Sequence, residues 1–139
     1  MFDLAELDTT AMANEGFDVS IYHTKTGVDT GIIIRVLGQD SDSFIKEKRR
    51  QEKKQKDRMM KGGFRINHLL SSEEQEQDNL KLLAAATIAW RQEDKNTITF
   101  EGAELECNEK NVIMIYSRIK DIREQIDRAV GDRANFIKA

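Results

Sequence analysis

Residues 112–139 read VIMIYSRIKDIREQIDRAVGDRANFIKA, and up to Gly131 this stretch repeats apolar side chains at steps of three or four. That repeat is the period of one helix face. The apolar positions are Val112, Ile115, Ile119, Ile122, Ile126 and Val130. Charged residues lie between them, so the pattern predicts one long amphipathic helix that begins near Glu109, is capped by Asn108 and ends near Val130. We expect Gly131 to adopt the left-handed conformation that ends many helices.

The segment after this helix, residues 132–136, is polar and carries one aromatic side chain. A charged segment with a single aromatic residue is typical of a short anchor on a partner protein. We therefore expect the partner-binding residues to be Ile122, Arg123, Ile126, Val130, Asp132, Arg133, Asn135 and Phe136. On this hypothesis, replacing Arg133 and Phe136 by alanine weakens partner binding and leaves thermal stability nearly unchanged.

Composition predicts one small domain with a modest core, because 34% of the 139 residues are charged and 39% are hydrophobic. The net charge of −3 by itself indicates neither a nucleic-acid partner nor a membrane surface. Cys107 is the only cysteine, so no internal disulfide forms, and the absence of proline is compatible with long helices. No apolar run of about 18 residues and no signal-peptide pattern occur, so we expect a soluble cytoplasmic protein.

The N-terminal half predicts a β-hairpin. Residues 17–23 alternate apolar and polar side chains, residues 25–31 contain two glycines suited to a turn, and residues 32–37 are β-branched. Residues 1–16 are expected to form a flexible segment with a loose helical turn around Leu4 and Leu7. The remainder, 17–139, is expected to be a single domain.

A strongly basic helix is expected next, capped by Asp40, Ser41 or Asp42 and starting near Ser43. Residues 46–61 hold nine Lys or Arg and three acidic residues, a net charge of +6, and no apolar residue before Met59. The middle of this helix should therefore lie in solvent. It supplies a second group of expected partner-binding residues, Arg49, Arg50, Lys53 and Lys54. An alternative is nucleic-acid binding by residues 46–61, although no aromatic side chain lies there to stack on a base.

Gly62 and Gly63 are expected to end this helix, and residues 64–70 form a connector. Ser71 and Glu74 resemble a capping box that opens the most apolar helix of the chain, which should end near Trp90 or Arg91. Residues 97–100 and 103–107 predict a short second hairpin or an extended loop. The expected fold class is α+β: a helix-dominated small domain with an N-terminal hairpin and a long C-terminal helix.

Residues with catalytic potential are few and scattered. His23, His68 and Cys107 lie in different predicted elements, and none is part of a metal-ligand motif such as CxxC or HExxH. The glycines form no phosphate-binding loop of a known pattern. We therefore expect no catalytic residue, metal site or cofactor. An enzyme would have to show turnover that depends on one of these three side chains.

Residues 122–136, IREQIDRAVGDRANF, resemble the closing motif W-I-x-x-Q-[VI]-x-x-A-[IV]-x-[DE]-R-x-N-F of the tail assembly chaperones of long-tailed, siphovirus-type bacteriophages. Other parts resemble the family in the same order: the hairpin region 27–42, the basic helix, residues 82–90, and residues 98–102 followed by 108–111. The resemblance covers roughly residues 17–136. The chain departs from the family at 120–121, where Lys-Asp stands in place of a bulky pair such as Pro-Trp.

The resemblance implies a non-enzymatic protein of the host bacterial cytoplasm that binds the tape measure and tail tube proteins during virion morphogenesis and is absent from the mature virion. In many relatives, encoded by phages or prophages, a ribosomal frameshift adds a C-terminal extension. A tape measure protein is a long helical chain with apolar stripes, which aggregates when bare. An amphipathic helix together with charged helices would cover such stripes, and the same elements are expected to support self-association.

Overall fold

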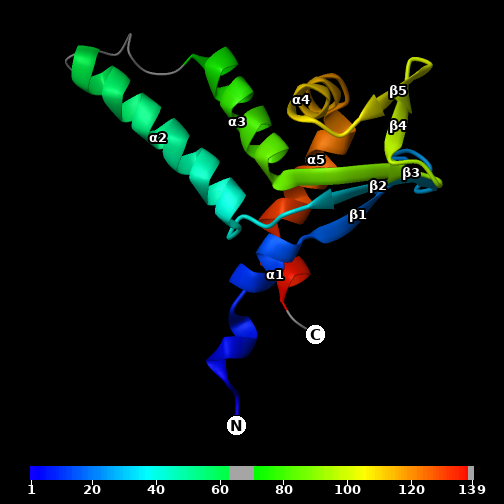
Figure 1. Ribbon diagram of the computed structural model, residues 1–139, viewed down its shortest axis with the longest axis horizontal. Helices are drawn as coiled ribbons and strands as arrows, with labels where there is room; N and C mark the ends of the chain where they lie inside the picture. The colour runs from blue at the N-terminus through cyan, green and yellow to red at the C-terminus, as the bar shows by residue number, and fades with distance from the viewer. Residues whose placement is uncertain (63–70, 138–139) are drawn as a thin grey trace.

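The computed structural model describes residues 1–62 and 71–137 and has the α+β fold expected from the sequence, with helices predominant. Two sheets and several helices follow one another along the chain (Figure 1). Their bounds are η1 Leu4–Leu7, α1 Thr10–Glu15, β1 Phe17–Tyr22, β2 Asp29–Val36, α2 Asp42–Gly62, α3 Ser72–Ala86, β3 Thr87–Gln92, β4 Thr97–Phe100, β5 Ala103–Glu106, α4 Glu109–Arg118, α5 Lys120–Gly131 and η3 Arg133–Phe136.

The main sheet is antiparallel, with strand order β1-β2-β3, and β4 and β5 form the second hairpin. Val19, Ile34 and Trp90 are register partners across the three strands, and all three are buried. Asp18 and Arg91 are exposed on the opposite face and form a salt bridge. The sheet therefore has one buried face and one solvent face, which is why its strands alternate in polarity.

The helices α2 and α3 form an insertion between two neighbouring strands, β2 and β3 (Figure 1). The base of the insertion is closed by a hydrogen bond at 2.6 Å from the Leu37 N–H to the Ala86 carbonyl. Ser41 is the side chain that caps α2, because its Oγ accepts a hydrogen bond from the Phe44 N–H at 3.3 Å. The predicted connector 64–70, with His68, lies outside the described residues.

The long C-terminal helix predicted from the sequence is instead two helices, α4 and α5, which meet at Ile119. The backbone of Ile119 has φ −113° and ψ 89°, outside the helical region. No glycine lies near this position and the chain contains no proline, so tertiary packing causes the break. With the break at Ile119, both helices bury apolar side chains in the core: Val112 and Ile115 on α4, and Ile122, Ile126 and Val130 on α5.

The apolar helix α3 ends at Ala86, and Trp90 lies in β3 rather than in the helix as the sequence suggested. Thr87 marks the change: its hydroxyl donates to the Leu83 carbonyl at 2.8 Å and lies 2.7 Å from the hydroxyl of the buried Tyr116. The indole N–H of Trp90 donates to the Leu105 carbonyl at 3.0 Å. The tryptophan therefore joins the main sheet to the β4–β5 hairpin.

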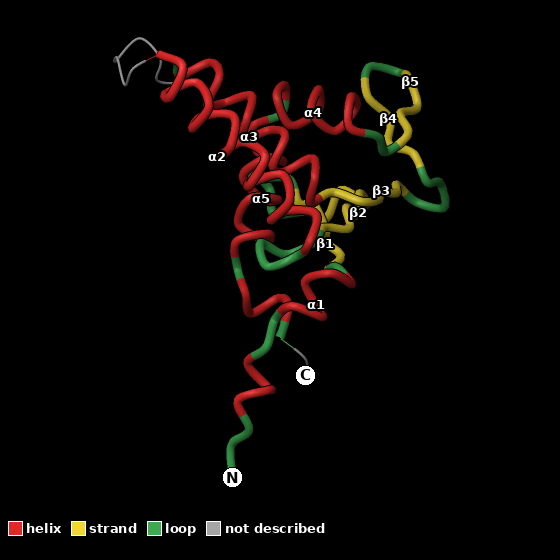
Figure 2. Tube along the Cα trace, turned by 60° about the vertical axis from the view of Figure 1, so that its left-hand side comes forward, coloured by secondary structure: helices red, strands yellow, loops and turns green. Residues whose placement is uncertain are grey.

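Part of the segment 1–16, which was expected to be flexible, packs against the rest of the domain. Thr9, which precedes α1, and Ala13, which lies within it, are both buried against the core. Residues 1–8 are exposed and extend away from the body of the molecule, with the predicted turn present as η1 (Figure 2). Gly16 makes the sharp entry into β1 at φ 98°, where a Cβ would lie 2.9 Å from the Val36 carbonyl oxygen.

Several local predictions are confirmed. The first hairpin, the second hairpin and the N-caps of α3 and α4 are present, with Asn108 Oδ1 accepting from the Asn111 N–H at 2.9 Å. One half of the capping box is present, because Ser71 Oγ accepts from the Glu74 N–H at 3.2 Å, and the Glu74 carboxylate also binds Arg58. Gly131 is helical without a positive φ, so its predicted left-handed role is wrong.

Candidate functional site

The apolar residues expected to bind a partner at the C-terminal end are part of the core. Ile122 is 9% exposed, Ile126 0%, Val130 2% and Phe136 1%. The ring of Phe136 packs edge-to-face against Phe17 with centroids 6.2 Å apart. These four side chains are therefore covered by their own domain and offer no free surface to a partner in this structure.

The polar residues of the same segment also bind within the domain. Asp132 caps η3 by accepting from the Ala134 N–H at 3.0 Å, and the Asn135 side-chain amide donates to the Ala129 carbonyl at 3.0 Å. Arg123 on α5 forms a salt bridge with Glu76 on α3 at 3.1 Å. We call residues 132–136 the C-terminal clasp, because they fasten the end of the chain to the core.

Arg133 completes the clasp through two hydrogen bonds to Asp40, at 2.8 and 3.0 Å. Asp40 also accepts a hydrogen bond from the Thr9 hydroxyl at 2.5 Å. The hydrogen bond from Arg133, followed by that from Thr9, lowers the pKa of Asp40 to about 2. One carboxylate therefore joins the start of the domain, the loop before α2 and the clasp.

Gly38 provides the space for the clasp. A Cβ at this position would lie 2.9 Å from Ala13 Cβ and 3.0 Å from the ring of Phe136. The buried aromatic ring thus sits against bare backbone, which no other residue type would allow without displacement. Sequence periodicity could not find this contact, because residues 38 and 136 are distant along the chain.

Gln125 is a structurally important residue of the closing motif that the sequence reasoning missed. It is 6% exposed, and its amide makes two hydrogen bonds to the backbone of Tyr22 on β1. The available signal was its position: a polar residue next to Ile126 on the apolar side of an otherwise amphipathic helix. A buried amide at such a position needs hydrogen-bond partners.

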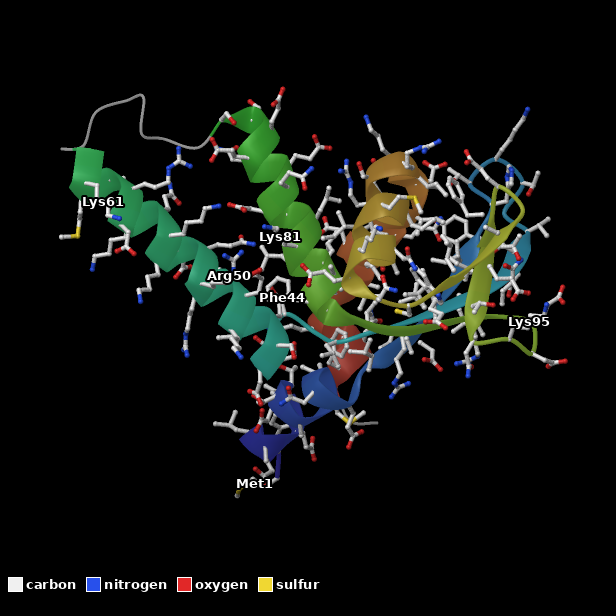
Figure 3. The ribbon with its side chains drawn as sticks, turned by 45° about the horizontal axis from the view of Figure 1, so that its top comes forward. Met1, Phe44, Arg50, Lys61, Lys81 and Lys95 are labelled. Atoms are coloured by element: carbon white, nitrogen blue, oxygen red, sulfur yellow. The ribbon has the colours of Figure 1, made fainter. Side chains whose placement is uncertain are left out.

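The second predicted site, on α2, remains exposed. Lys46, Arg49, Lys53 and Lys56 follow one another at steps of three or four and are all exposed, so they share one side of the helix. Among the described residues none of these four cations forms a salt bridge. We call them the outer basic stripe of α2. Figure 3 shows the side chains of α2 reaching into solvent between Phe44 and Lys61.

The other two predicted residues of this helix lie beside the stripe and serve partly within the domain. Arg50 forms a salt bridge with Glu47 at 2.6 Å, and the charge of Lys54 acts on the Glu74 carboxylate of α3. A shallow groove of about 350 Å³ runs along this flank. It is lined by Arg50, Lys53, Lys54, Asp57, Arg58 and Lys61. Of the predicted group, Arg49 lies on the outer basic stripe alone, Lys53 belongs to the stripe and also lines the groove, and Arg50 and Lys54 line the groove.

A larger cleft of about 610 Å³ lies between α3 and α5. Phe44 and Leu82 give it an apolar part, while Glu124 and Asp127 give it an acidic rim. Arg123 also lines the cleft and is paired with Glu76. The cleft combines apolar surface with negative charge but contains no convergent catalytic pair.

The described residues that could take part in catalysis or bind a metal, His23 and Cys107, lie in settings that serve the fold. His23 Nδ1 accepts from the Lys25 N–H at 3.2 Å within the turn after β1. Cys107 is half-buried, and burial raises the pKa of its thiol to about 11, so it is protonated at neutral pH. Within the described residues no three His, Cys, Asp or Glu side chains gather as a metal site. None of the helices described is long and apolar enough to cross a membrane.

Comparison with family models, with curated proteins and with solved structures gives no match to this chain.

Proposed function

We propose that this protein is a tail assembly chaperone of a long-tailed bacteriophage. It acts without catalysis in the host bacterial cytoplasm, where it binds the tape measure and tail tube proteins before the tail tube polymerises. The basis is the closing motif at residues 122–136 together with the order of the segments before it. Since fold and motif carry function only by analogy, the proposal needs a direct binding test.

The observation that carries the proposal is that the specified positions of the closing motif act together within the domain. Gln125 binds the backbone of β1, Arg133 pairs with Asp40, and Asn135 binds the Ala129 carbonyl. Phe136 fills the space beside Gly38. A motif whose residues cooperate in closing one fold supports a resemblance at the level of the whole domain rather than of a short segment.

The partner surface belongs on α2 under this proposal, because the clasp is buried. The outer basic stripe offers four cations that form no salt bridge with any carboxylate among the described residues. On its inner side the same helix already packs against α3, whose first turns carry Glu73, Glu74, Glu76 and Asp78. We infer that the stripe binds an acidic helical segment of the partner, as the inner side of α2 binds α3.

The test is co-purification with the tape measure and tail tube proteins encoded in the same genome. The triple variant Arg49→Glu, Lys53→Glu and Lys56→Glu should lose most of the co-purified partner. The matched control, Lys25→Glu, Lys110→Glu and Lys120→Glu, changes the net charge equally at exposed positions outside α2 and should retain it. If the wild-type protein retains neither partner, the chaperone proposal is wrong. If both triple variants behave alike, the assignment to α2 is wrong.

A second candidate function is nucleic-acid binding, which the cation-lined groove beside the stripe favours. Fluorescence anisotropy with a labelled DNA duplex separates the two. A nucleic-acid-binding protein would bind the duplex with an affinity that falls steeply with salt. The α2 triple variant would lose this DNA binding, and the control triple variant would keep it. The chaperone proposal expects weak binding that both triple variants reduce equally.

A further inference from the structure

The two helices of the inserted hairpin are attached to the domain very unequally. Helix α3 buries Leu80, Leu83, Ala84 and Ala86 in the core. Helix α2 has no buried residue between 42 and 61, and Phe44, in its first turn, is its one described side chain that packs against the core. Apolar burial therefore fixes the C-terminal half of α3, from Leu80 to Ala86, but fixes α2 only at its start.

The start of α2 is held firmly. Ser41 is fully buried, and its Oγ accepts from the Phe44 N–H. The Asp42 N–H donates to Asn14 Oδ1 on α1 at 2.9 Å. These contacts, with Phe44, define a fixed point at residues 41–44 from which the rest of the helix extends away from the sheet (Figure 1).

Beyond this fixed point, polar groups connect α2 to α3. The Gln51 side-chain amide donates to the Asp78 carbonyl at 2.8 Å, and Arg58 forms an ion pair with Glu74. The Arg58 and Glu74 side chains are 32% and 42% exposed. Figure 3 shows polar side chains of both helices between them, near the labelled Arg50 and Lys81. Asp78 is only 7% exposed, so this row of contacts between α2 and α3, here called the seam, also contains a largely covered acidic residue.

Such a seam is easily opened. Water replaces polar contacts at partly exposed positions with little loss, and an exposed ion pair weakens as salt screens it. Segments with few buried apolar contacts are those that open locally while the remaining structure stays folded.

We propose that α2 is a hinged arm that detaches from α3 by rotating about residues 41–44 while the sheet, α3 and α5 stay folded, and that the Arg58–Glu74 ion pair sets how often it detaches. Detachment makes the inner side of α2 and the acidic side of α3 accessible to a partner. The arm does not depend on the chaperone proposal, which needs only the outer basic stripe.

The experiment measures distances between nitroxide labels at Lys56→Cys on α2 and Gln77→Cys on α3, in the Cys107→Ala background, by double electron–electron resonance. With Arg58 and Glu74 unchanged, the two labels should show a short distance population, with α2 on α3, and a long one, with α2 detached. The long population should increase about two- to fivefold between low salt and about 1 M NaCl, and by a similar factor in Arg58→Glu, which is the range expected for an exposed ion pair. The charge swap Arg58→Glu with Glu74→Arg should return it toward the wild-type value.

Two controls make the outcome decisive. Arg49→Glu changes the charge of α2 by the same amount on its outer side and should leave the distances unchanged. A label pair at Gln77 and Lys120 reports on α3 and α5 and should show one distance under all conditions. A single distance between the α2 and α3 labels that changes neither with salt nor in Arg58→Glu would overturn the proposal. A parallel change in the control pair would also overturn it, because the whole domain would then be loosening.

Discussion

Gln125 on α5 and Tyr22 on β1 are joined by two hydrogen bonds: the Tyr22 N–H donates to Gln125 Oε1 at 3.2 Å, and Gln125 Nε2 donates to the Tyr22 carbonyl at 3.0 Å. β1 is an edge strand of the main sheet, and its pairing with β2 shifts register between Ser20 and Tyr22. The glutamine amide therefore satisfies the backbone groups that a neighbouring strand would otherwise bind.

Replacing Gln125 with leucine should destabilise the domain by about 1–3 kcal/mol, because the Tyr22 backbone groups would stay covered without partners. Urea unfolding measures the change. Gln77→Leu, at an exposed position of α3, is the matched control and should change the free energy of unfolding by less than about 0.5 kcal/mol. Equal effects at both positions would mean that the amide contact contributes nothing.

Replacing Phe136 with alanine should lower the free energy of unfolding by about 3–5 kcal/mol, since the ring is fully buried in the core. This reverses the sequence-based expectation that the change would leave thermal stability unchanged. Ile137→Ala removes the neighbouring side chain, which is 39% exposed, and should have a small effect. A melting temperature unaffected by Phe136→Ala would show that the clasp is not closed in solution.

Two glycines should respond oppositely to alanine. Gly38→Ala should destabilise by about 1–3 kcal/mol, because the new methyl group overlaps Ala13 and the Phe136 ring. Gly131→Ala should stabilise by up to about 1 kcal/mol, because no atom lies within 4 Å of the added Cβ and the residue is helical. Thermal unfolding of both variants checks the pair, and destabilisation by Gly131→Ala would contradict the observed end of α5.

The Asp40–Arg133 pair should make stability pH-dependent in acid. The folded-state pKa of Asp40, about 2, lies below the ordinary 3.8, so its stabilisation is present above about pH 4 and is lost as the pH falls through 2. Asp40→Asn should lower stability by about 1 kcal/mol at pH 7. By linkage, the difference from wild type should be about half as large at pH 3.

Arg133→Gln supplies the control for this prediction. It removes the partner that contributes most to the lowered pKa, so adding it to Asp40→Asn should cost little further stability. A difference between wild type and Asp40→Asn that stays constant from pH 7 to pH 3 would show that the carboxylate titrates normally in the folded protein.

Local sequence patterns predicted much of the secondary structure. Alternation in residues 17–23 and β-branched residues in 32–37 indicated the first hairpin, and Ser71 and Asn108 marked helix starts. These features depend on near neighbours, because a cap or a two-residue period acts within a few residues along the chain. The α+β fold class followed from them.

The candidate site was less accessible to sequence reasoning. The apolar stripe from Ile122 to Val130 correctly identified side chains that must be covered, but not what covers them. A periodic pattern is the same for a core helix and for a docking helix. The partner of Phe136 is Gly38, and that of Arg133 is Asp40, more than 90 residues away.

The sequence by itself determined most of the elements, the N-caps of α3 and α4 and the apolar side of the amphipathic segments, because these depend on the chemistry of adjacent residues. The tertiary structure alone decided that the helix breaks at Ile119, that Trp90 joins a strand, and that the C-terminal clasp turns inward. Each of these depends on which distant surface is available to bury an apolar side chain or to pair a buried polar group. Those surfaces exist only once the sheet and helices have assembled.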